Sequence, residues 1–265
     1  VNINRKWAFT KQATSVPSEL PVNWDWVNLP HSWNAIDGQD GDSDFYRGTC
    51  YYVKKLLKTD LPETDKYYLE IKGANSSADV YVNGKVLAHH DGGYSTWRVD
   101  ITNHLQHENL IVIAVDNAPN DKVYPQFADF TFYGGLYRDV NIVCVNDSHF
   151  ELMYHGGPGL KITPVVNGKN ADVEIETWLA NAKAGQQVKY VVKDAEGNVV
   201  CEKATADTKV NFIIENAHLW HGRKDPYLYT AELQLLDGET VLDEIRTRLG
   251  SRTFKIDPKE GFFLN

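Results

Sequence analysis

Apolar and polar residues alternate with a period of two along most of this 265-residue chain, and this alternation restricts the fold more than any other feature. The strands of a half-buried sheet have this period, because successive side chains point to opposite faces. Asn83-Gly84, between the alternating runs 78–82 and 85–87, is typical of a two-residue hairpin turn. No run of ten or more residues has the period of an amphipathic helix. The sequence therefore predicts an all-β chain.

The spacing of the expected strands changes near residue 146. Before it, longer apolar runs occupy 67–71, 110–115 and 140–145. After it, seven shorter runs are separated by turn signals: 160–166, 172–179, 187–193, 199–203, 209–214, 227–236 and 240–246. Seven short strands in about 100 residues are typical of an immunoglobulin-like sandwich. We therefore expect two β-sandwich domains in series, residues 1–146 and 147–250, with residues 251–265 left over.

The charge of the chain argues against two classes of partner. There are 27 basic and 36 acidic residues, which give a net charge of −9. Such a charge repels phosphate backbones and anionic lipids. No apolar run approaches the ~20 residues that span a bilayer. We therefore expect neither nucleic acid nor a membrane as a partner.

Motifs for self-contained chemistry are absent from the sequence. It has no Gly-x-Ser-x-Gly elbow, no phosphate-binding loop and no Cys-x-x-Cys pair. Its three cysteines cannot all pair, and Cys50 and Cys144 lie in strand-like apolar runs, so buried thiols are expected rather than a disulfide framework. His89 and His90 are adjacent and would point to opposite faces of a strand, so they cannot bind one ion together. An acidic run at 37, 40, 42 and 44 resembles the start of a calcium loop, but Tyr51 stands where the bidentate glutamate belongs. We therefore expect no metal and no cofactor.

Aromatic residues gather near the N-terminus, where Trp24, Trp26 and Trp33 fall within ten residues. Most of these rings are expected in the core, because large rings fill the interior of a β-sandwich. Aromatic faces beside carboxylates also suit sugar hydroxyls and rings. Composition by itself thus indicates a β-sandwich protein that is a candidate for carbohydrate binding.

A series of short segments resembles known motifs along nearly the whole chain. The segments are Leu29–Asn34 (LPHSWN), Tyr46–Gly48 with Tyr51-Tyr52, Ala78–Lys85 (ADVYVNGK), His90–Tyr94, Asp100–Thr102, Val115–Asn117, Gly134–Val140 (GGLYRDV), Leu219-Trp220 with Pro226–Tyr229, Arg252–Phe254 and Gly261–Asn265 (GFFLN). In this order they resemble the N-terminal region of glycoside hydrolase family 2, the family of β-galactosidases, β-glucuronidases and β-mannosidases. The style of LPHSWN and DFYRG is nearest to the bacterial β-galactosidases.

The resemblance implies a jelly-roll sugar-binding domain, an immunoglobulin-like domain and, from residue 251, the approach to a (β/α)8 barrel. A retaining glycosidase needs two carboxyl groups about 5–5.5 Å apart. In this family both are glutamates of the barrel, which places them beyond Asn265, so no catalytic residue is expected here. The apolar run at Gly261–Asn265 also suggests a protein that continues. The chain alone is therefore expected to be inactive.

Two aspartates are the candidate substrate-binding residues. In the β-galactosidases of the family, an aspartate just before the GG-YRD strand helps to close the subsite for the terminal sugar, and the matching residue is Asp129. Asp44, before Phe45-Tyr46-Arg47-Gly48, is the second candidate. For Asp129, an aspartate that caps a loop turn is the alternative.

Three functional hypotheses follow. The first is a non-catalytic fragment of a β-glycosidase, β-galactosidase by preference, whose partners are a terminal β-linked sugar and its own catalytic barrel. The second is a free-standing carbohydrate-binding module with an immunoglobulin-like spacer, and the third is a structural or adhesive pair of sandwiches. Family members are often oligomers, so a homo-oligomer stays an open alternative. The start at Val1, without methionine, favours a bacterial protein exported to the periplasm or secreted, with the cytoplasm as the alternative.

Overall fold

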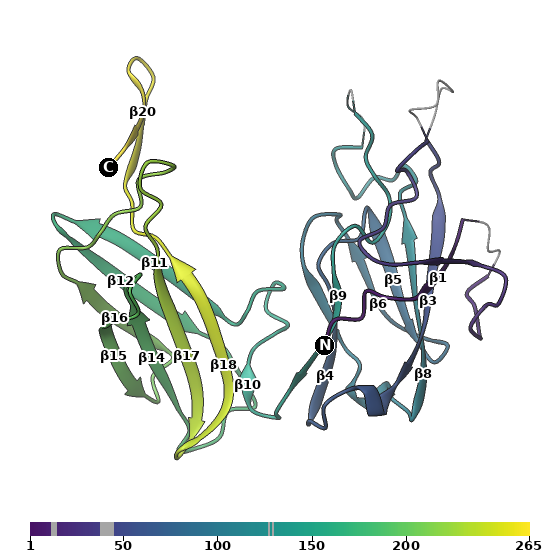
Figure 1. The fold of residues 1–265 in the computed structure, drawn as a ribbon, viewed down its shortest axis with the longest axis horizontal. Helices are drawn as coiled ribbons and strands as arrows, with labels where there is room; N and C mark the ends of the chain where they lie inside the picture. Colours follow the sequence, from purple (N-terminus) through teal and green to yellow (C-terminus); the bar gives the residue numbers. More distant parts are fainter. Residues whose placement is uncertain (12–14, 38–44, 127, 129) are drawn as a thin grey trace. The chain divides into compact units, whose positions relative to one another are not determined.

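The computed structural model describes residues 1–11, 15–37, 45–126, 128 and 130–265 (Figure 1). The chain forms two compact units, residues 1–145 and 146–265, and each has its own hydrophobic core. The helical structure within the described ranges is limited to two short 3-10 turns, Lys58–Asp60 (η1) and Thr102–His104 (η2), and no described helix could cross a membrane. The prediction of an all-β chain is confirmed.

The first unit is a sandwich of two antiparallel sheets. One sheet has the order β2-β1-β3-β8-β5-β6 and the other has the order β7-β4-β9. The strands are β1 (Trp7–Thr10), β2 (Asp25–Val27), β3 (Thr49–Leu57), β4 (Lys66–Ile71), β5 (Ser77–Val82), β6 (Lys85–Asp91), β7 (Trp97–Asp100), β8 (Glu108–Asp116) and β9 (Val140–Val145). Their inward side chains, such as Tyr52 and Ile113 from the larger sheet and Leu69 from the smaller one, form a single buried cluster.

The predicted hairpin at Asn83-Gly84 is present between β5 and β6. Both turn residues have positive φ, 52° and 80°, which is the backbone that a type I′ turn requires. Every second residue of β5 is buried, so that Ala78, Val80 and Val82 face the core. The period of two in the sequence therefore marks the inward face of this strand.

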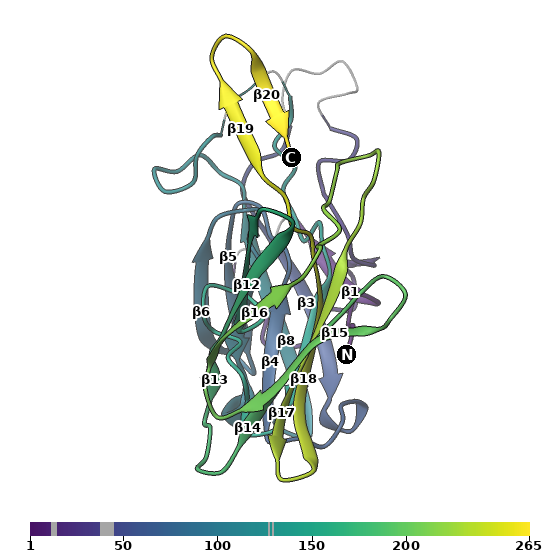
Figure 2. The same ribbon diagram turned by 90° about the vertical axis from the view of Figure 1, so that its left-hand side faces the viewer.

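The second unit is also a sandwich, with a three-stranded sheet β11-β12-β16 and a four-stranded sheet β15-β14-β17-β18 (Figure 2). Its strands are β10 (His149–Phe150), β11 (Leu160–Asn167), β12 (Asn170–Thr177), β13 (Leu179–Ala180), β14 (Gln187–Lys193), β15 (Val199–Thr205), β16 (Lys209–Ile214), β17 (Tyr229–Asp237) and β18 (Thr240–Leu249). The seven strands of the two sheets are those that the sequence predicts. The fold class, a jelly-roll sandwich followed by an immunoglobulin-like sandwich, is confirmed.

A separate hairpin follows the second sandwich. Strands β19 (Phe254–Asp257) and β20 (Gly261–Leu264) pair with each other and project beyond the two sheets (Figure 2). Large apolar side chains on this hairpin are exposed, namely Phe254, Ile256, Phe262 and Phe263. Most of the segment 251–265, for which the resemblance implies the approach to a barrel, is thus a hairpin with exposed apolar side chains.

Candidate functional site

Both predicted site residues, Asp44 and Asp129, lie outside the described residues. The segments beside them are described, and they belong to the loops 31–37, 45–48 and 117–135 of the first unit. The candidate site is therefore built here from the residues that hold these three loops together.

The loops meet at the side chain of Asn34, which has no solvent exposure. Its Nδ2 donates to Asp37 Oδ2 (3.0 Å) and to the carbonyl oxygen of Tyr46 (3.0 Å). Its Oδ1 accepts from the backbone N–H of Gly134 (2.7 Å) and from Asn117 Nδ2 (3.2 Å). One buried amide therefore joins segments that are up to 100 residues apart in the sequence.

A second amide, that of Asn117, extends this cluster. Its Oδ1 accepts from the backbone N–H of Gly48 (3.0 Å), and its Nδ2 also lies 3.3 Å from the Tyr46 carbonyl oxygen. Buried amides with all of their hydrogen bonds made have few alternative arrangements, because a lost bond would leave a desolvated polar group. We call Asn34 and Asn117 the amide pair, and it fixes the loops on either side of both predicted aspartates.

The two glycines of the GGLYRDV segment are required by close packing. A Cβ on Gly134 would lie 2.2 Å from Cζ2 of the buried Trp33. Gly135 has φ +126°, and a Cβ there would lie 2.5 Å from the His31 carbonyl oxygen. These contacts leave no room for a side chain, so the segment passes directly over the LPHSWN loop.

Several aromatic side chains on the described part of these loops are exposed. Tyr124 is 92% exposed and Phe130 is 63% exposed, while Tyr133 and Tyr46 are partly exposed. The rings of Phe130 and Phe132 pack against each other with centroids 5.0 Å apart. Exposed rings on a fixed loop framework can stack against a flat apolar ligand surface, and sugar rings present such surfaces.

Arg47 links two of the loops. Its Nη2 donates to the carbonyl oxygen of Gln126 (2.9 Å), and its guanidinium lies over the ring of Phe45 with Cζ 4.5 Å from the centroid. These contacts tie the residues that follow position 44 to the residues that precede position 127. Arg47 therefore has a structural role at the base of the candidate site.

His31, at the start of the first loop, is held as a neutral ring. Its Nδ1 lies 2.8 Å from the hydroxyl oxygen of the buried Tyr52. Burial, followed by the positive charge of Lys11, lowers the pKa of His31 below its usual value. At neutral pH this imidazole is therefore uncharged, and it acts as a hydrogen-bonding part of the loop framework.

Other residues that the sequence singled out lie away from these loops or serve the framework. His89 and His90 point to opposite faces, as predicted, since His89 bonds to Asp79 (2.7 Å) and His90 stacks on Trp97. All three cysteines are free. Across the described ranges, no group of three or more histidine, cysteine or acidic side chains is placed to hold a metal.

Arg138 and Asp139, both in the GGLYRDV segment, have different hydrogen-bond partners. Arg138 donates to the carbonyl oxygen of Tyr94 (3.0 Å), whereas Asp139 accepts from Asn4 (2.8 Å) and from Lys72 (3.4 Å). Both side chains therefore bind other parts of the first unit.

The sequence reasoning did not identify the amide pair. Asn34 closes the LPHSWN segment, and Asn117 closes the segment Val115–Asn117. The available signal was therefore an asparagine at the end of each motif, but nothing in the sequence indicated that the two amides meet.

Two family models match the chain. The model described as "Glycosyl hydrolase 2 galactose-binding domain-like" matches residues 43–128, and that of "Glycosyl hydrolases family 2" matches residues 158–252. Together they cover more than half of the chain.

Similar proteins include both kinds of glycosidase. A β-glucuronidase of Bacteroides fragilis is 31% identical over 90% of this chain, and a β-galactosidase of Thermoanaerobacter pseudethanolicus is 27% identical over all of it. The crystal structure of an FMN-binding β-glucuronidase from Faecalibacterium prausnitzii L2-6 superposes with a TM-score of 0.91 at 34% identity, over 100% of this chain and 41% of that one. The chain spans 36% and 37% of the two curated relatives, about a third of their length.

Proposed function

The chain belongs to glycoside hydrolase family 2, and from this membership we propose that it forms two non-catalytic N-terminal domains of a retaining β-glycosidase. In the complete enzyme, the loops around the amide pair close one side of the subsite for the terminal sugar. Asp129 is the principal sugar-binding residue of these loops, and Asp44 is the second. Each carboxylate accepts a hydrogen bond from a sugar hydroxyl.

One observation carries this proposal. The buried amide of Asn34 makes four hydrogen bonds, and all four go to segments that flank residues 44 and 129. A sugar site needs polar groups held in place before the ligand arrives, because ordering a loose loop on binding lowers affinity. The exposed rings beside these loops supply the apolar part of such a site.

The proposed substrate is a β-linked pyranoside whose terminal sugar is glucuronic acid or galactose. Relatives named for each activity match the whole of this chain or nearly all of it. Similarity to relatives therefore does not decide between the two sugars. An activity assay of the complete enzyme decides it.

The exposed hairpin β19–β20 supports a further domain as partner. Four large apolar side chains of this hairpin face solvent, and apolar area of this kind is normally covered in a folded protein. We assign this role to the catalytic barrel of the complete enzyme, which supplies the two carboxyl groups that retaining hydrolysis requires.

Kinetics of the complete enzyme test the proposal. Asp129→Ala is expected to lower kcat/KM for 4-nitrophenyl β-galactoside or β-glucuronide by about 10- to 100-fold. This is the effect expected when one hydrogen bond to a charged group is lost from the transition state. Asp44→Ala is expected to have a smaller effect in the same direction. Asp121→Ala, an exposed aspartate of the same loop region, is the matched control and should leave kcat/KM unchanged.

Two results would reject the assignment. If Asp129→Ala and Asp121→Ala have the same kcat/KM as the unmodified enzyme, the loops do not contribute to the sugar subsite. If the gene ends at the codon for Asn265 and the chain binds galactosides or glucuronides by itself, the protein is a free-standing carbohydrate-binding module instead.

A further inference from the structure

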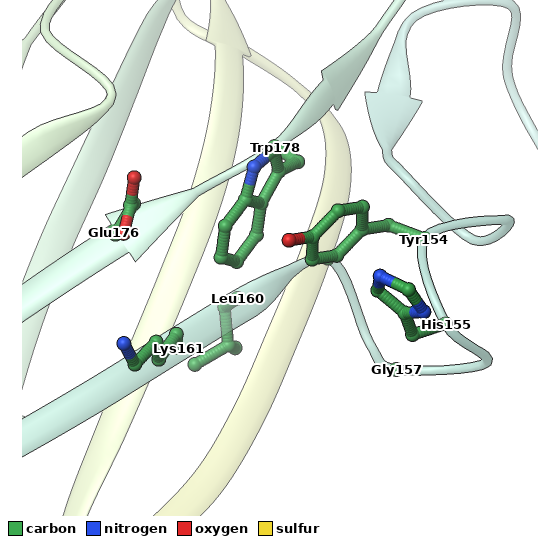
Figure 3. Close-up of a pocket in the computed structure, with 8 residues that line it drawn as sticks. Tyr154, His155, Gly157, Leu160, Lys161, Glu176 and Trp178 are labelled. Carbon is green, nitrogen blue, oxygen red and sulfur yellow. The ribbon is translucent and has the colours of Figure 1, made fainter.

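The second unit has a pocket of about 470 Å³ that the proposed function does not use (Figure 3). Its side-chain lining consists of Tyr154, His155, Leu160, Lys161, Glu176 and Trp178. All of these residues belong to the second unit, so the pocket is separate from the loops that carry Asp44 and Asp129. We call it the Trp178 pocket.

The loop between β10 and β11 forms one wall of the pocket, and its two ends are fixed to Trp178. The backbone N–H of Glu151 donates to the Trp178 carbonyl oxygen (2.8 Å), and the Trp178 N–H donates to the carbonyl oxygen of Gly159 (2.9 Å). Gly159 has φ +76°, and a Cβ there would lie 2.7 Å from the Glu151 nitrogen. The wall therefore exists without a ligand, which reduces the entropy lost on binding.

Two stacked aromatic rings dominate this wall. The rings of Tyr154 and Trp178 lie with centroids 4.5 Å apart and an interplanar angle of 19°. His155 packs edge-on against Tyr154 at 4.5 Å. Tyr154 is 45% exposed although it is stacked, so a large part of its surface is open to a ligand. Aromatic rings that stay exposed beside a hollow are suited to the apolar face of a ring-shaped ligand.

Polar groups stand beside these rings on the same side of the sheet. Glu176 and Trp178 are two residues apart at the end of β12, where the alternate residues Ile175 and Thr177 are buried, so Glu176 and Trp178 both face outward. Lys161 of β11 lies directly opposite Glu176 in the strand register and faces the same way. Figure 3 shows Glu176 and Lys161 on one side of the Trp178 ring and Tyr154 on the other.

We propose that the Trp178 pocket binds one pyranose residue of an oligosaccharide. The sugar ring stacks against the Tyr154–Trp178 pair, the Glu176 carboxylate accepts hydrogen bonds from its hydroxyls, and the Lys161 ammonium donates to a hydroxyl or to a uronic carboxylate. This site belongs to the second unit and is not part of the proposed terminal-sugar subsite, which belongs to the first unit. The choice of a sugar as the ligand rests on the proposed function, whereas the existence of the pocket is independent of it.

Nuclear magnetic resonance of the 265-residue chain tests this proposal. The seven tryptophans give separate indole N–H signals, and the signal of Trp178 is the one that Trp178→Phe removes. Galactobiose and a glucuronic-acid-containing disaccharide are titrated in parallel. We expect the Trp178 signal to shift with a saturating curve and a Kd on the order of 1 mM, the value that usual ligand efficiency gives for one sugar ring.

Variants separate stacking from hydrogen bonding. Tyr154→Ala is expected to weaken binding about tenfold, because it removes one of the two rings. Glu176→Gln and Lys161→Met leave the loop intact and distinguish the two sugars, since Lys161→Met should weaken the acidic disaccharide more. Trp26→Ala, which removes an exposed tryptophan of the first unit, is the matched control and should not change the titration.

The outcomes are distinct from those for the proposed function. If the Trp178 signal does not move at 20 mM of either sugar, or if Tyr154→Ala binds as the unmodified chain does, the Trp178 pocket is not a sugar site. That result leaves the Asp129 kinetics untouched, because the two sites lie in different units. A titration that moves Trp178 while Asp129→Ala has unchanged kcat/KM would support this pocket and reject the proposed function.

Discussion

Replacing Asn34 with alanine removes the side chain on which the loop framework of the first unit depends. Asn34→Ala deletes four hydrogen bonds of a side chain that has no solvent exposure. Three of the former partners keep other bonds: Asn117 Nδ2 still donates to the Tyr46 carbonyl oxygen, and Asp37 Oδ2 still accepts from the Tyr46 N–H (2.9 Å). The N–H of the buried Gly134 is left without the acceptor that Asn34 supplied.

The expected cost follows from these partners. A buried donor without an acceptor costs about 1–3 kcal/mol, and the lost bond to the Asp37 carboxylate adds about 1 kcal/mol or more. We therefore expect Asn34→Ala to lower the free energy of unfolding of the first unit by about 2–4 kcal/mol. With the m-value that is usual for a small domain in urea, the urea concentration at the midpoint of unfolding should fall by about 1–2 M.

The assay must observe the two units separately, since a chain with two cores need not unfold in one step. Amide signals of the first and second units, followed by NMR through a urea titration, give one midpoint for each. Asn120→Ala is the matched control. Asn120 also makes side-chain hydrogen bonds in this loop region, but it is exposed, so that water replaces them.

The reasoning is refuted if Asn34→Ala shifts the midpoint of the first unit no more than Asn120→Ala does. It is also refuted if the second unit loses as much stability as the first, because all four hydrogen-bond partners of Asn34 belong to the first unit. A shift confined to the first unit and several times that of the control is the result that we expect.

Three further predictions concern packing and titration. Gly134→Ala is expected to destabilise the first unit by about 1–3 kcal/mol or more, because the new Cβ would overlap the buried indole ring of Trp33. Gly157→Ala is the control and should be close to neutral, because its Cβ would have its nearest contact at 3.4 Å. Thermal unfolding measures both effects. Burial raises the pKa of Cys50 to about 12, so this thiol should resist Ellman's reagent at pH 8 until urea is added. Hydrogen bonds to neighbouring aspartates raise the pKa of His89, and burial lowers the pKa of His90, so NMR titration should place the two on opposite sides of 6.5. Because the His89 pKa is higher in the folded chain than in the unfolded one, the charged ring stabilises the first unit at a pH below its unfolded pKa, and this contribution is lost as the pH rises through the folded value. Equal titration of the two histidines would contradict the assignment of their environments.

The strands and their inward faces could be predicted from the sequence alone. The expected runs 187–193, 209–214 and 140–145 coincide with β14, β16 and β9. The Asn83-Gly84 turn could be predicted as well. These features are local: strand periodicity follows from the pleat of one chain, and the turn depends on which residues tolerate positive φ. The short strands β1 and β2 were not predicted, because three or four residues are too few to show a period.

The assembly of the candidate site was decided only by the tertiary structure. Asn34, Asn117 and Gly134 are far apart in the sequence, and each is unremarkable where it stands. Tyr154 belongs to a loop and Trp178 to a strand end far from it in the sequence, and only the register of β11 against β12 sets Lys161 beside Glu176. A sequence determines local backbone preference and the period of burial. The contacts between distant side chains depend on which strands pair and in what register, and this is fixed by the packing of the whole core.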